Sequence, residues 1–260
     1  MTTDKRIGLE GKIVAITGGY GHLGSGISKG ILNHGGIAIV LGRSKEKFDD
    51  LKSKLNNHEN LYFEFMDISD VDSVKMAYSN MIKNFNRIDV LINNAYFGKS
   101  EIPEKMSDHD FYIGIEGTLN SVFRCIRELL PYLNRDARII NISSMYGTVS
   151  PDFRIYENCP EFQSPPNYGA AKAAIQQLTR YFANYLGPNG ITVNCISPGP
   201  FPSPKVQQNI DFIKHLEEKT ALRRIGRPED LEGICAFLAS DFSAYITGQN
   251  FAVDGGWTIS

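Results

Sequence analysis

The chain has 260 residues, with 27 Lys and Arg against 29 Asp and Glu, so its net charge at neutral pH is −2. A near-neutral chain without a basic cluster is not expected to bind nucleic acid, and its apolar runs are too short to cross a membrane. The length suits a single globular domain spanning residues 1–260, with ample material for a buried core.

Cysteine and histidine usage excludes two further classes of protein. The four cysteines are far apart and form no Cys-x-x-Cys pair, so neither a disulfide framework nor a thiolate metal site is expected. The five histidines lack the spacing that would place two rings on one helical face. Residues 1–6 are polar, with no apolar stretch of signal-peptide length. The sequence predicts a metal-free, cytoplasmic protein.

Short apolar runs alternate with longer stretches of helical periodicity. The expected strands are 12–17, 37–41, 61–66, 89–92, 138–143 and 191–196, and the expected helices between and after them are 22–34, 45–55, 71–85, 108–133 and 167–186. Val, Ile and Leu dominate the strand runs with little polar alternation, which is typical of strands covered on both faces. The pattern predicts an α/β fold with a doubly wound parallel β-sheet and helices on both faces.

Two proline-rich segments, 149–166 and 197–208, interrupt this alternation, and each follows an expected strand. In an open α/β sheet the ligand crevice lies outside the carboxyl ends of the strands, where these segments must lie. Long loops in a compact domain commonly serve as lids or binding loops. We therefore expect a substrate loop at 149–166 and a lid within 197–226.

A glycine-rich turn joins the first expected strand to the first expected helix. Glycines allow a tight turn and close approach of the backbone to a pyrophosphate, which the amides and the helix dipole then stabilise. A tight strand-to-helix turn needs glycine in any case, but this position favours a Rossmann-type dinucleotide site. Its candidate cofactor contacts are Gly18, Tyr20, Gly21, His22, Leu23 and Gly24.

Further motifs fall at the ends of later strands. They are Asn93-Asn94-Ala95, Ser143-Ser144, Tyr168-Gly169-Ala170-Ala171-Lys172, Ser197-Pro198-Gly199 and Val253-Asp254-Gly255-Gly256-Trp257. Together with the glycine-rich turn, they resemble the short-chain dehydrogenase/reductase family, in the single-domain branch that carries Tyr-x-x-x-Lys. The resemblance covers essentially the whole chain, with the motifs in the family's order.

The reacting group is expected to contain Ser144, Tyr168 and Lys172. Tyr168 and Lys172 are four residues apart on a predicted helix and so share one face. An ammonium beside a phenol stabilises the phenolate and lowers the pKa of the tyrosine toward the range that acid–base catalysis needs. The resemblance implies that Tyr168 exchanges a proton with the substrate oxygen and that Lys172 also holds the nicotinamide ribose. It implies that Ser144 orients the substrate carbonyl. Ser143 is the neighbouring alternative for this role and is expected to be structural.

Three positions depart from the family pattern. Thr118 stands where the family often has an asparagine that serves a proton relay, and Asn120, about 200° further around the helix, would point away. Tyr96 replaces the glycine that usually follows Asn-Asn-Ala, and it either lines the cleft or packs beneath the loop. His22 replaces a frequent glycine of the phosphate loop and is expected to change packing more than chemistry.

The second expected strand decides the cofactor. NAD-specific members place an acid at its end, which binds the ribose 2′-hydroxyl and repels a 2′-phosphate. Here the end reads Gly42-Arg43-Ser44, and the guanidinium fork of Arg43 with the Ser44 hydroxyl favours NADP, unless Arg43 stacks on adenine or faces solvent. The remaining cofactor contacts that the resemblance implies are Asp67, Ile68, Asn94, Ala95, Pro198, Gly199 and Ser203, together with Tyr168 and Lys172.

The predicted reaction is NADP(H)-dependent hydride transfer to or from a carbonyl or secondary alcohol of a small polar, possibly sugar-like molecule. Phe153, Tyr156 and Phe162 of the substrate loop either stack on such a substrate or anchor the loop to its own protein. Two alternatives stay open: an NAD-linked dehydrogenase of polyols or sugar acids, and a non-catalytic dinucleotide-binding protein. The carboxyl-terminal motif and the apolar faces of two long helices suggest a homotetramer or homodimer.

Overall fold

The computed structural model describes residues 8–260, so the polar segment 1–6 considered above lies outside the described residues. Seven parallel strands form one sheet in the order β3-β2-β1-β4-β5-β6-β7. The strands are β1 (Ile13–Thr17), β2 (Ile37–Gly42), β3 (Leu61–Phe65), β4 (Ile88–Asn93), β5 (Leu133–Ile142), β6 (Thr192–Pro198) and β7 (Asn250–Val253). The predicted doubly wound α/β fold is confirmed.

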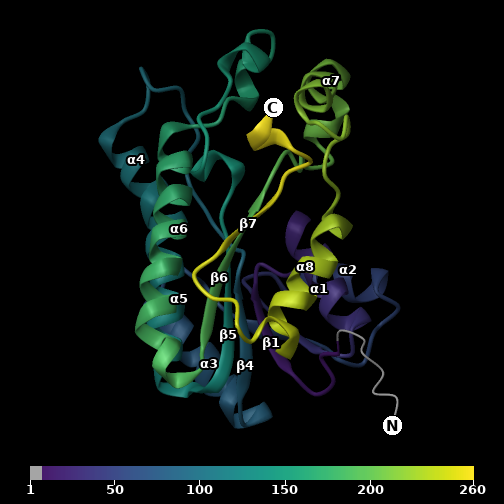
Figure 1. Cartoon of the computed structure of the whole chain (residues 1–260), viewed down its shortest axis with the longest axis vertical. Coiled ribbons are helices and arrows are strands. Elements are labelled where there is room, and N and C mark those ends of the chain that lie inside the picture. Colours follow the sequence, from purple (N-terminus) through teal and green to yellow (C-terminus); the bar gives the residue numbers. More distant parts are fainter. Residues whose placement is uncertain (1–7) are drawn as a thin grey trace.

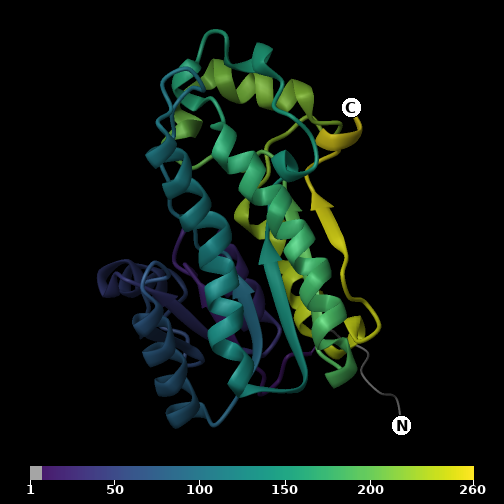
Figure 2. The same ribbon diagram turned by 90° about the vertical axis from the view of Figure 1, so that its left-hand side faces the viewer.

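Helices cover both faces of the sheet (Figures 1 and 2). The helices are α1 (His22–Asn33), α2 (Lys45–Lys54), α3 (Val71–Phe85), α4 (Asp108–Ile115), α5 (Ser121–Leu129), α6 (Pro166–Leu186), α7 (Ile210–Lys219) and α8 (Glu232–Ala239). Helix α7 lies beyond the end of the sheet, beside segment 149–166, the predicted substrate loop (Figure 2). Within residues 8–260, no helix is both long and apolar enough to cross a membrane.

Alternate strand residues build two separate cores. Ile39 packs in the core with α3, α5 and α6, whereas the next residue, Val40, packs in the core with α1 and α8. Both side chains are at most 1% exposed. Each such aliphatic side chain contributes about 1.5–3 kcal/mol when fully buried, which explains why the strand runs lack polar alternation.

The helix expected over 108–133 is wrong as a single element. A π-helical turn, Glu116–Asn120, separates α4 from α5, and α5 ends before Pro131. Strand β5 begins at Leu133, which pairs with Ile88, rather than at residue 138 as expected. Proline lacks the amide needed to continue a helix, and pairing with β4 extends the strand through polar residues that no apolar pattern marks.

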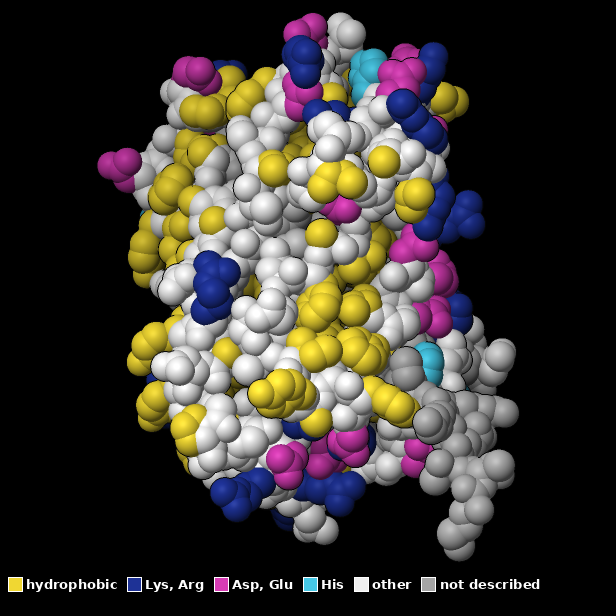
Figure 3. All heavy atoms as spheres, viewed as in Figure 1, with side chains coloured by type: hydrophobic (Ala, Val, Ile, Leu, Met, Phe, Trp, Pro, Cys, Tyr) yellow, Lys and Arg dark blue, Asp and Glu magenta, His cyan; other side chains and the backbone are white. Residues whose placement is uncertain are grey.

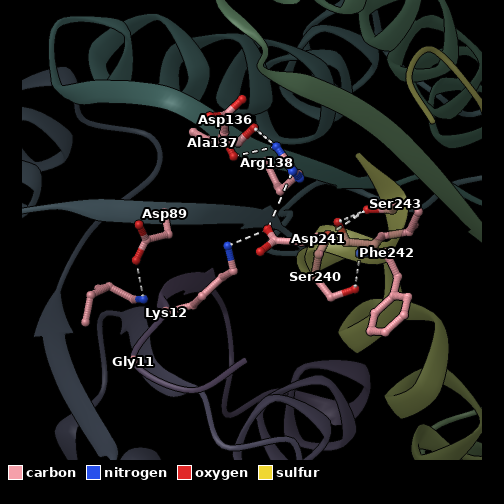
Figure 4. Close-up of polar contacts among 12 residues, drawn as sticks. Gly11, Lys12, Asp89, Asp136, Ala137, Arg138, Ser240, Asp241, Phe242 and Ser243 are labelled. Carbon is pink, nitrogen blue, oxygen red and sulfur yellow. Dashed lines mark hydrogen bonds and ion pairs between the residues drawn. The ribbon is translucent and has the colours of Figure 1, made fainter. Parts of the chain in front are cut away.

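An ionic cluster ties elements together at the amino ends of the strands, opposite the motif-bearing edge (Figure 4). Asp241, after α8, lies 2.8 Å from Lys12 Nζ and 3.7 Å from the guanidinium of Arg138 on β5. Arg138 is 3% exposed and also donates to the Ala137 carbonyl. A buried charge requires such partners, so Asp241 and the Ala137 carbonyl offset part of the cost of burying the Arg138 guanidinium.

Candidate active site

Two adjoining cavities open at the carboxyl ends of the strands. The first, of about 590 Å³, runs from the glycine-rich turn past the end of β2 to Tyr168 and Lys172. The second, of about 460 Å³, lies among the substrate loop, the lid and α7. Both volumes are typical of cofactor and small-molecule sites. The cavities share the residues Tyr96, Ser144, Tyr168, Gly199, Phe201 and Val206.

The glycine-rich turn has the shape that a pyrophosphate site requires. Gly18 has a φ of +64°, and a Cβ on Gly24 would lie only 2.1 Å from the Gly18 carbonyl oxygen. Gly21 precedes the first turn of α1 and has no side chain to cap its amides. The backbone amides at the positive end of α1 are therefore left free to bind an anion in the first cavity.

The Asn94-Ala95 pair fastens β4 to the glycine-rich turn. The backbone amides of Asn94 and Ala95 donate to Thr17 Oγ1 at 2.9 and 3.0 Å. Asn94 Nδ2 donates to the carbonyls of Thr17 and Gly18 at 3.0 and 3.2 Å. These contacts fix the turn from behind, so the cavity is preorganised before any ligand binds.

At the end of β2, Tyr20 and Gly42 fit together. A Cβ added to Gly42 would lie 2.5 Å from the Tyr20 ring, so the ring occupies the space that an acidic side chain would need. The Tyr20 hydroxyl accepts the backbone amides of Arg43 and Ser44 at 3.0 and 3.2 Å. The local chain is thereby fixed, while the Arg43 side chain stays 66% exposed at the cavity.

Two further charges lie near Arg43. Asp67 Oδ2 is 3.6 Å from its guanidinium, and Lys47, in the first turn of α2, also lines the first cavity. Partial burial tends to raise the pKa of Asp67, but hydrogen bonds from Ser69 and the charge of Arg43 outweigh it, so the pKa is lowered. This end of the first cavity thus has two cations, Arg43 and Lys47, against the carboxylate of Asp67.

Tyr168 and Lys172 project from the first half of α6 toward Ser144. Lys172 is 3% exposed and its Nζ donates to the Ile142 carbonyl at 2.7 Å. The same ammonium lies 5.6 Å from the centre of the Tyr168 ring. The neighbouring Ser143 donates its hydroxyl to the Lys172 carbonyl at 2.7 Å, which is a structural contact. Ser144 lines both cavities, whereas Ser143 lines only the first.

Burial sets the proton affinities of this group. It lowers the pKa of Lys172 to about 8, and the ammonium remains the preferred form at neutral pH. Burial also raises the pKa of Tyr168, helped by the nearby Tyr96 and opposed by a hydrogen bond with Ser144. The expected lowering of the Tyr168 pKa by Lys172 is not found; the pKa is raised. A protonated Tyr168 at neutral pH is the form that donates a proton to an oxygen.

Comparison with known proteins gives the family. The model of a family described as "Enoyl-(Acyl carrier protein) reductase" matches residues 22–258. The 3-oxoacyl-[acyl-carrier-protein] reductase FabG of Thermotoga maritima is 30% identical over 259 residues, covering 96% of this chain and 99% of that protein. The chain is a short-chain dehydrogenase/reductase. It is accordingly an NAD(P)-dependent oxidoreductase that acts on CH–OH and C=O groups.

Two solved structures resemble this short-chain dehydrogenase/reductase along its length. One, from Leptospira borgpetersenii with bound NAD⁺, has a TM-score of 0.87 and 32% identity and covers 100% of this chain and 97% of its own. The other, a Pseudomonas aeruginosa RhlG/NADP complex, has a TM-score of 0.88 and 28% identity and covers 99% of this chain and 100% of its own. Relatives thus bind either dinucleotide, and the family alone does not select one.

Thr118, which the sequence analysis compared with the family's relay asparagine, lies in the π-helical turn. Thr118 is 2% exposed and lines the second cavity. Asn120 donates its Nδ2 to Glu116 Oε2 at 2.6 Å, so its amide is engaged within the same turn. A hydroxyl therefore stands where the family often has an amide.

Tyr96 lies in the cleft, the first of the two positions considered for it. Its ring centre is 5.7 Å from that of Tyr168 and 5.3 Å from Lys172 Nζ. Lys172 is thus faced by two aromatic rings, which stabilise a buried ammonium. His22 also lines the first cavity, beside the backbone of Phe201 and Pro202, and burial lowers its pKa.

Most predicted contacts line the first cavity, including Ile68, Pro198, Gly199 and Ser203. Two predicted contacts do not. Gly24 packs against the turn itself, and the Ser44 hydroxyl accepts the Lys47 amide at 3.2 Å to cap α2. The sequence analysis missed Lys47, Phe97 and Phe201. Lys47 could have been found, because it lies in the first turn of the helix that begins just after Arg43 and Ser44. The two phenylalanines follow no motif.

The substrate loop and the lid meet over the second cavity. Tyr156 and Phe162 line it and also pack on Phe212 of α7, with ring centres 5.8 and 4.7 Å away. The two uses proposed for these aromatics are therefore compatible. Phe153 lies outside the cavity and is 53% exposed. Within residues 8–260, no group of three or more His, Cys, Asp or Glu side chains is arranged to hold a metal ion.

Proposed function

We propose that this enzyme reduces a carbonyl group of a small polar, oxygen-bearing substrate with NADPH. The observation that carries the proposal is that Ser144 and Tyr168 lie where the first cavity, which begins at the glycine-rich turn, meets the second cavity. The glycine-rich turn leaves no room for further side-chain atoms, which allows a pyrophosphate to approach its backbone closely. A nicotinamide bound there supplies the hydride.

The chain's own residues supply positioning and a proton. Ser144 donates a hydrogen bond to the substrate carbonyl and stabilises the negative charge that develops on its oxygen. Tyr168, protonated at neutral pH, transfers its phenolic proton to that oxygen. Lys172 places a positive charge beside the resulting phenolate and, through its ammonium, holds the nicotinamide ribose. Oxidation of an alcohol reverses these proton movements.

The end of β2 supports NADPH over NADH. Gly42 replaces the acid that would repel a 2′-phosphate, and the Tyr20 ring fills the space beside it. Arg43 and Lys47 place two cations at the same end of the cavity. The planar guanidinium of Arg43 would suit paired hydrogen bonds to a 2′-phosphate, and Lys47 would add a point charge. The NAD-linked polyol or sugar-acid dehydrogenase is the alternative within the same family.

The exposed apolar side chains of α5 and α6 support assembly into a homodimer or homotetramer. Phe123 is 41% exposed, and Tyr181 and Tyr185 are each 61% exposed. Hydrophobic side chains gather along this side of the molecule (Figure 3). Paired copies would bury such a patch in a two-fold interface. A cytoplasmic location is part of the same proposal, and four free, buried cysteines are compatible with a reducing compartment.

Substitution of Tyr168 tests the catalytic proposal. In Tyr168→Phe we expect NADPH affinity within about twofold of wild type and turnover lower by about 10²–10⁴, which is the usual contribution of a general acid. NADPH fluorescence reports binding, and a panel of ketones, aldehydes and hydroxyketones reports turnover. Tyr245→Phe is the matched control, because Tyr245 is fully exposed.

Each outcome of this experiment has one meaning. A fully active Tyr168→Phe enzyme contradicts the proton-transfer role. A wild-type protein that binds NADPH tightly but turns over no member of the panel, in either direction, favours the non-catalytic dinucleotide-binding alternative. Faster turnover with NAD⁺ and polyols than with NADPH and carbonyls favours the dehydrogenase alternative.

A further inference from the structure

Two tyrosine hydroxyls meet in the second cavity. Tyr146 and Tyr156 both line it, and their hydroxyl oxygens are 2.6 Å apart. A hydrogen bond between two phenols uses one of their two protons, so one O–H remains to donate to a third group. Tyr146 is the half-buried member and Tyr156 is 5% exposed. The free O–H of the Tyr146–Tyr156 pair therefore lies at the wall of the second cavity.

Either hydroxyl of the pair can be the donor. Burial raises the pKa of both tyrosines, so both are protonated at neutral pH and one O–H of the pair stays free in either arrangement. Tyr146 is the more exposed of the two residues, so a ligand in the second cavity has better access to Tyr146 than to Tyr156.

The pair is held rigidly by its surroundings. The Tyr146 ring lies 6.3 Å from that of Trp257, and the Tyr156 ring lies 5.8 Å from that of Phe212 on α7. Asp152, four residues before Tyr156, is 3.5 Å from Lys219 at the end of α7. The loop and α7 thus form one packed unit, and a preorganised hydroxyl loses little entropy when it binds a ligand.

The pair is also close to the reacting group. The Tyr146 amide donates to Ser144 Oγ at 3.2 Å. Ser144, Tyr146 and Tyr168 all line the second cavity. A substrate whose carbonyl lies at Ser144 and Tyr168 would therefore share this cavity with the Tyr146 side chain.

We propose that the Tyr146–Tyr156 pair is a second oxygen-binding subsite, which selects substrates carrying an uncharged hydroxyl or carbonyl a few bonds from the reacting carbon. This inference rests on the proposed function. The only charged residues lining the described second cavity are Lys99 and Glu161, of opposite sign, so the cavity provides no net positive charge for a carboxylate. Its aromatic floor of Tyr156, Phe162 and Phe212 suits the carbon skeleton of the substrate.

Matched cyclic ketones test the subsite. We compare kcat/KM for cyclohexanone, 2-hydroxycyclohexanone and 3-hydroxycyclohexanone with NADPH, in wild type, Tyr146→Phe and Tyr156→Phe. Wild type is expected to prefer at least one hydroxyketone by about tenfold, as one neutral hydrogen bond provides. Tyr146→Phe is expected to abolish that preference and leave kcat/KM for cyclohexanone within about twofold. Tyr112→Phe, which changes an exposed tyrosine of α4, is the control.

Binding measurements separate a failure of the subsite from a failure of the proposed function. They give the dissociation constants of the same ketones, and of the corresponding alcohols, in the ternary complex with oxidised or reduced cofactor. Turnover of all three ketones without a preference in wild type overturns the subsite and leaves the proposed function intact. An unchanged preference in both variants also overturns it. Tyrosine-dependent binding preference without turnover of any ketone or alcohol supports the subsite and contradicts the proposed function.

Discussion

Arg43→Ala gives the sharpest test of cofactor choice. The backbone amide of Arg43 donates a hydrogen bond to the Tyr20 hydroxyl, which fixes the backbone at this residue. The Arg43 side chain is 66% exposed, and its guanidinium lies 3.6 Å from Asp67. The substitution should therefore remove a cation without moving the loop. Charge-assisted hydrogen bonds contribute about 1.5–3 kcal/mol, equivalent to about 10–150-fold in Kd. Because Lys47 remains, we expect the low end, about 10–30-fold for NADPH, with NADH affinity unchanged.

The assay is fluorescence titration of both reduced cofactors at two salt concentrations. The NADPH affinity of the variant should depend less on salt than that of wild type, since one charge pair is lost. Arg135→Ala is the control, because it removes an exposed arginine at the opposite end of β5. An unchanged NADPH Kd would refute the phosphate contact. Equal losses for NADPH and NADH would instead show that Arg43 stacks on the adenine common to both.

Three other substitutions have defined outcomes. Gly42→Asp should lower the Tm, since overpacking against the Tyr20 ring costs about 1–3 kcal/mol. Adding Tyr20→Ala removes the ring, so the double variant should recover stability and bind NADH more tightly than NADPH. Lys172→Met should abolish turnover but raise the Tm at pH 7 by about 3–6 °C, because it removes a buried charge at the loss of one hydrogen bond. The pKa of Lys172 is lowered to about 8, so the buried charge destabilises the folded wild type fully below pH 8 and less and less as the pH rises toward 10.5. A higher Tm of Lys172→Met that persists at pH 10.5 would contradict the buried charge as its cause. A hydrogen bond from Arg154 holds the pKa of Asp152 well below its usual range, so Asp152→Asn should lower the Tm at pH 7. The difference in Tm from wild type should decline as the pH falls below about 4, where the carboxylate becomes protonated in the unfolded chain. A Tm difference that does not depend on pH would exclude the ion pair as its cause.

The sequence alone determined the fold class and the order of the reacting groups. Strand and helix alternation is a local pattern, and each apolar run predicts burial from its own residues. Tyr168 and Lys172 share a helical face because they are four residues apart, and the glycine-rich turn follows β1 directly. Such short spacings constrain geometry before any tertiary contact forms.

Tertiary structure alone decided how the cleft is lined. The ring of Tyr20 fills the space beside Gly42, 22 residues away, and Tyr96 lies over Lys172 although 76 residues separate them. Tyr146 and Tyr156 share a hydrogen bond only because the substrate loop folds back onto α7. No local periodicity encodes these contacts, since each depends on which surfaces the packed sheet and helices bring together. The family's chemistry could therefore be predicted from motifs, whereas the features proposed to select this enzyme's cofactor and substrate required the folded chain.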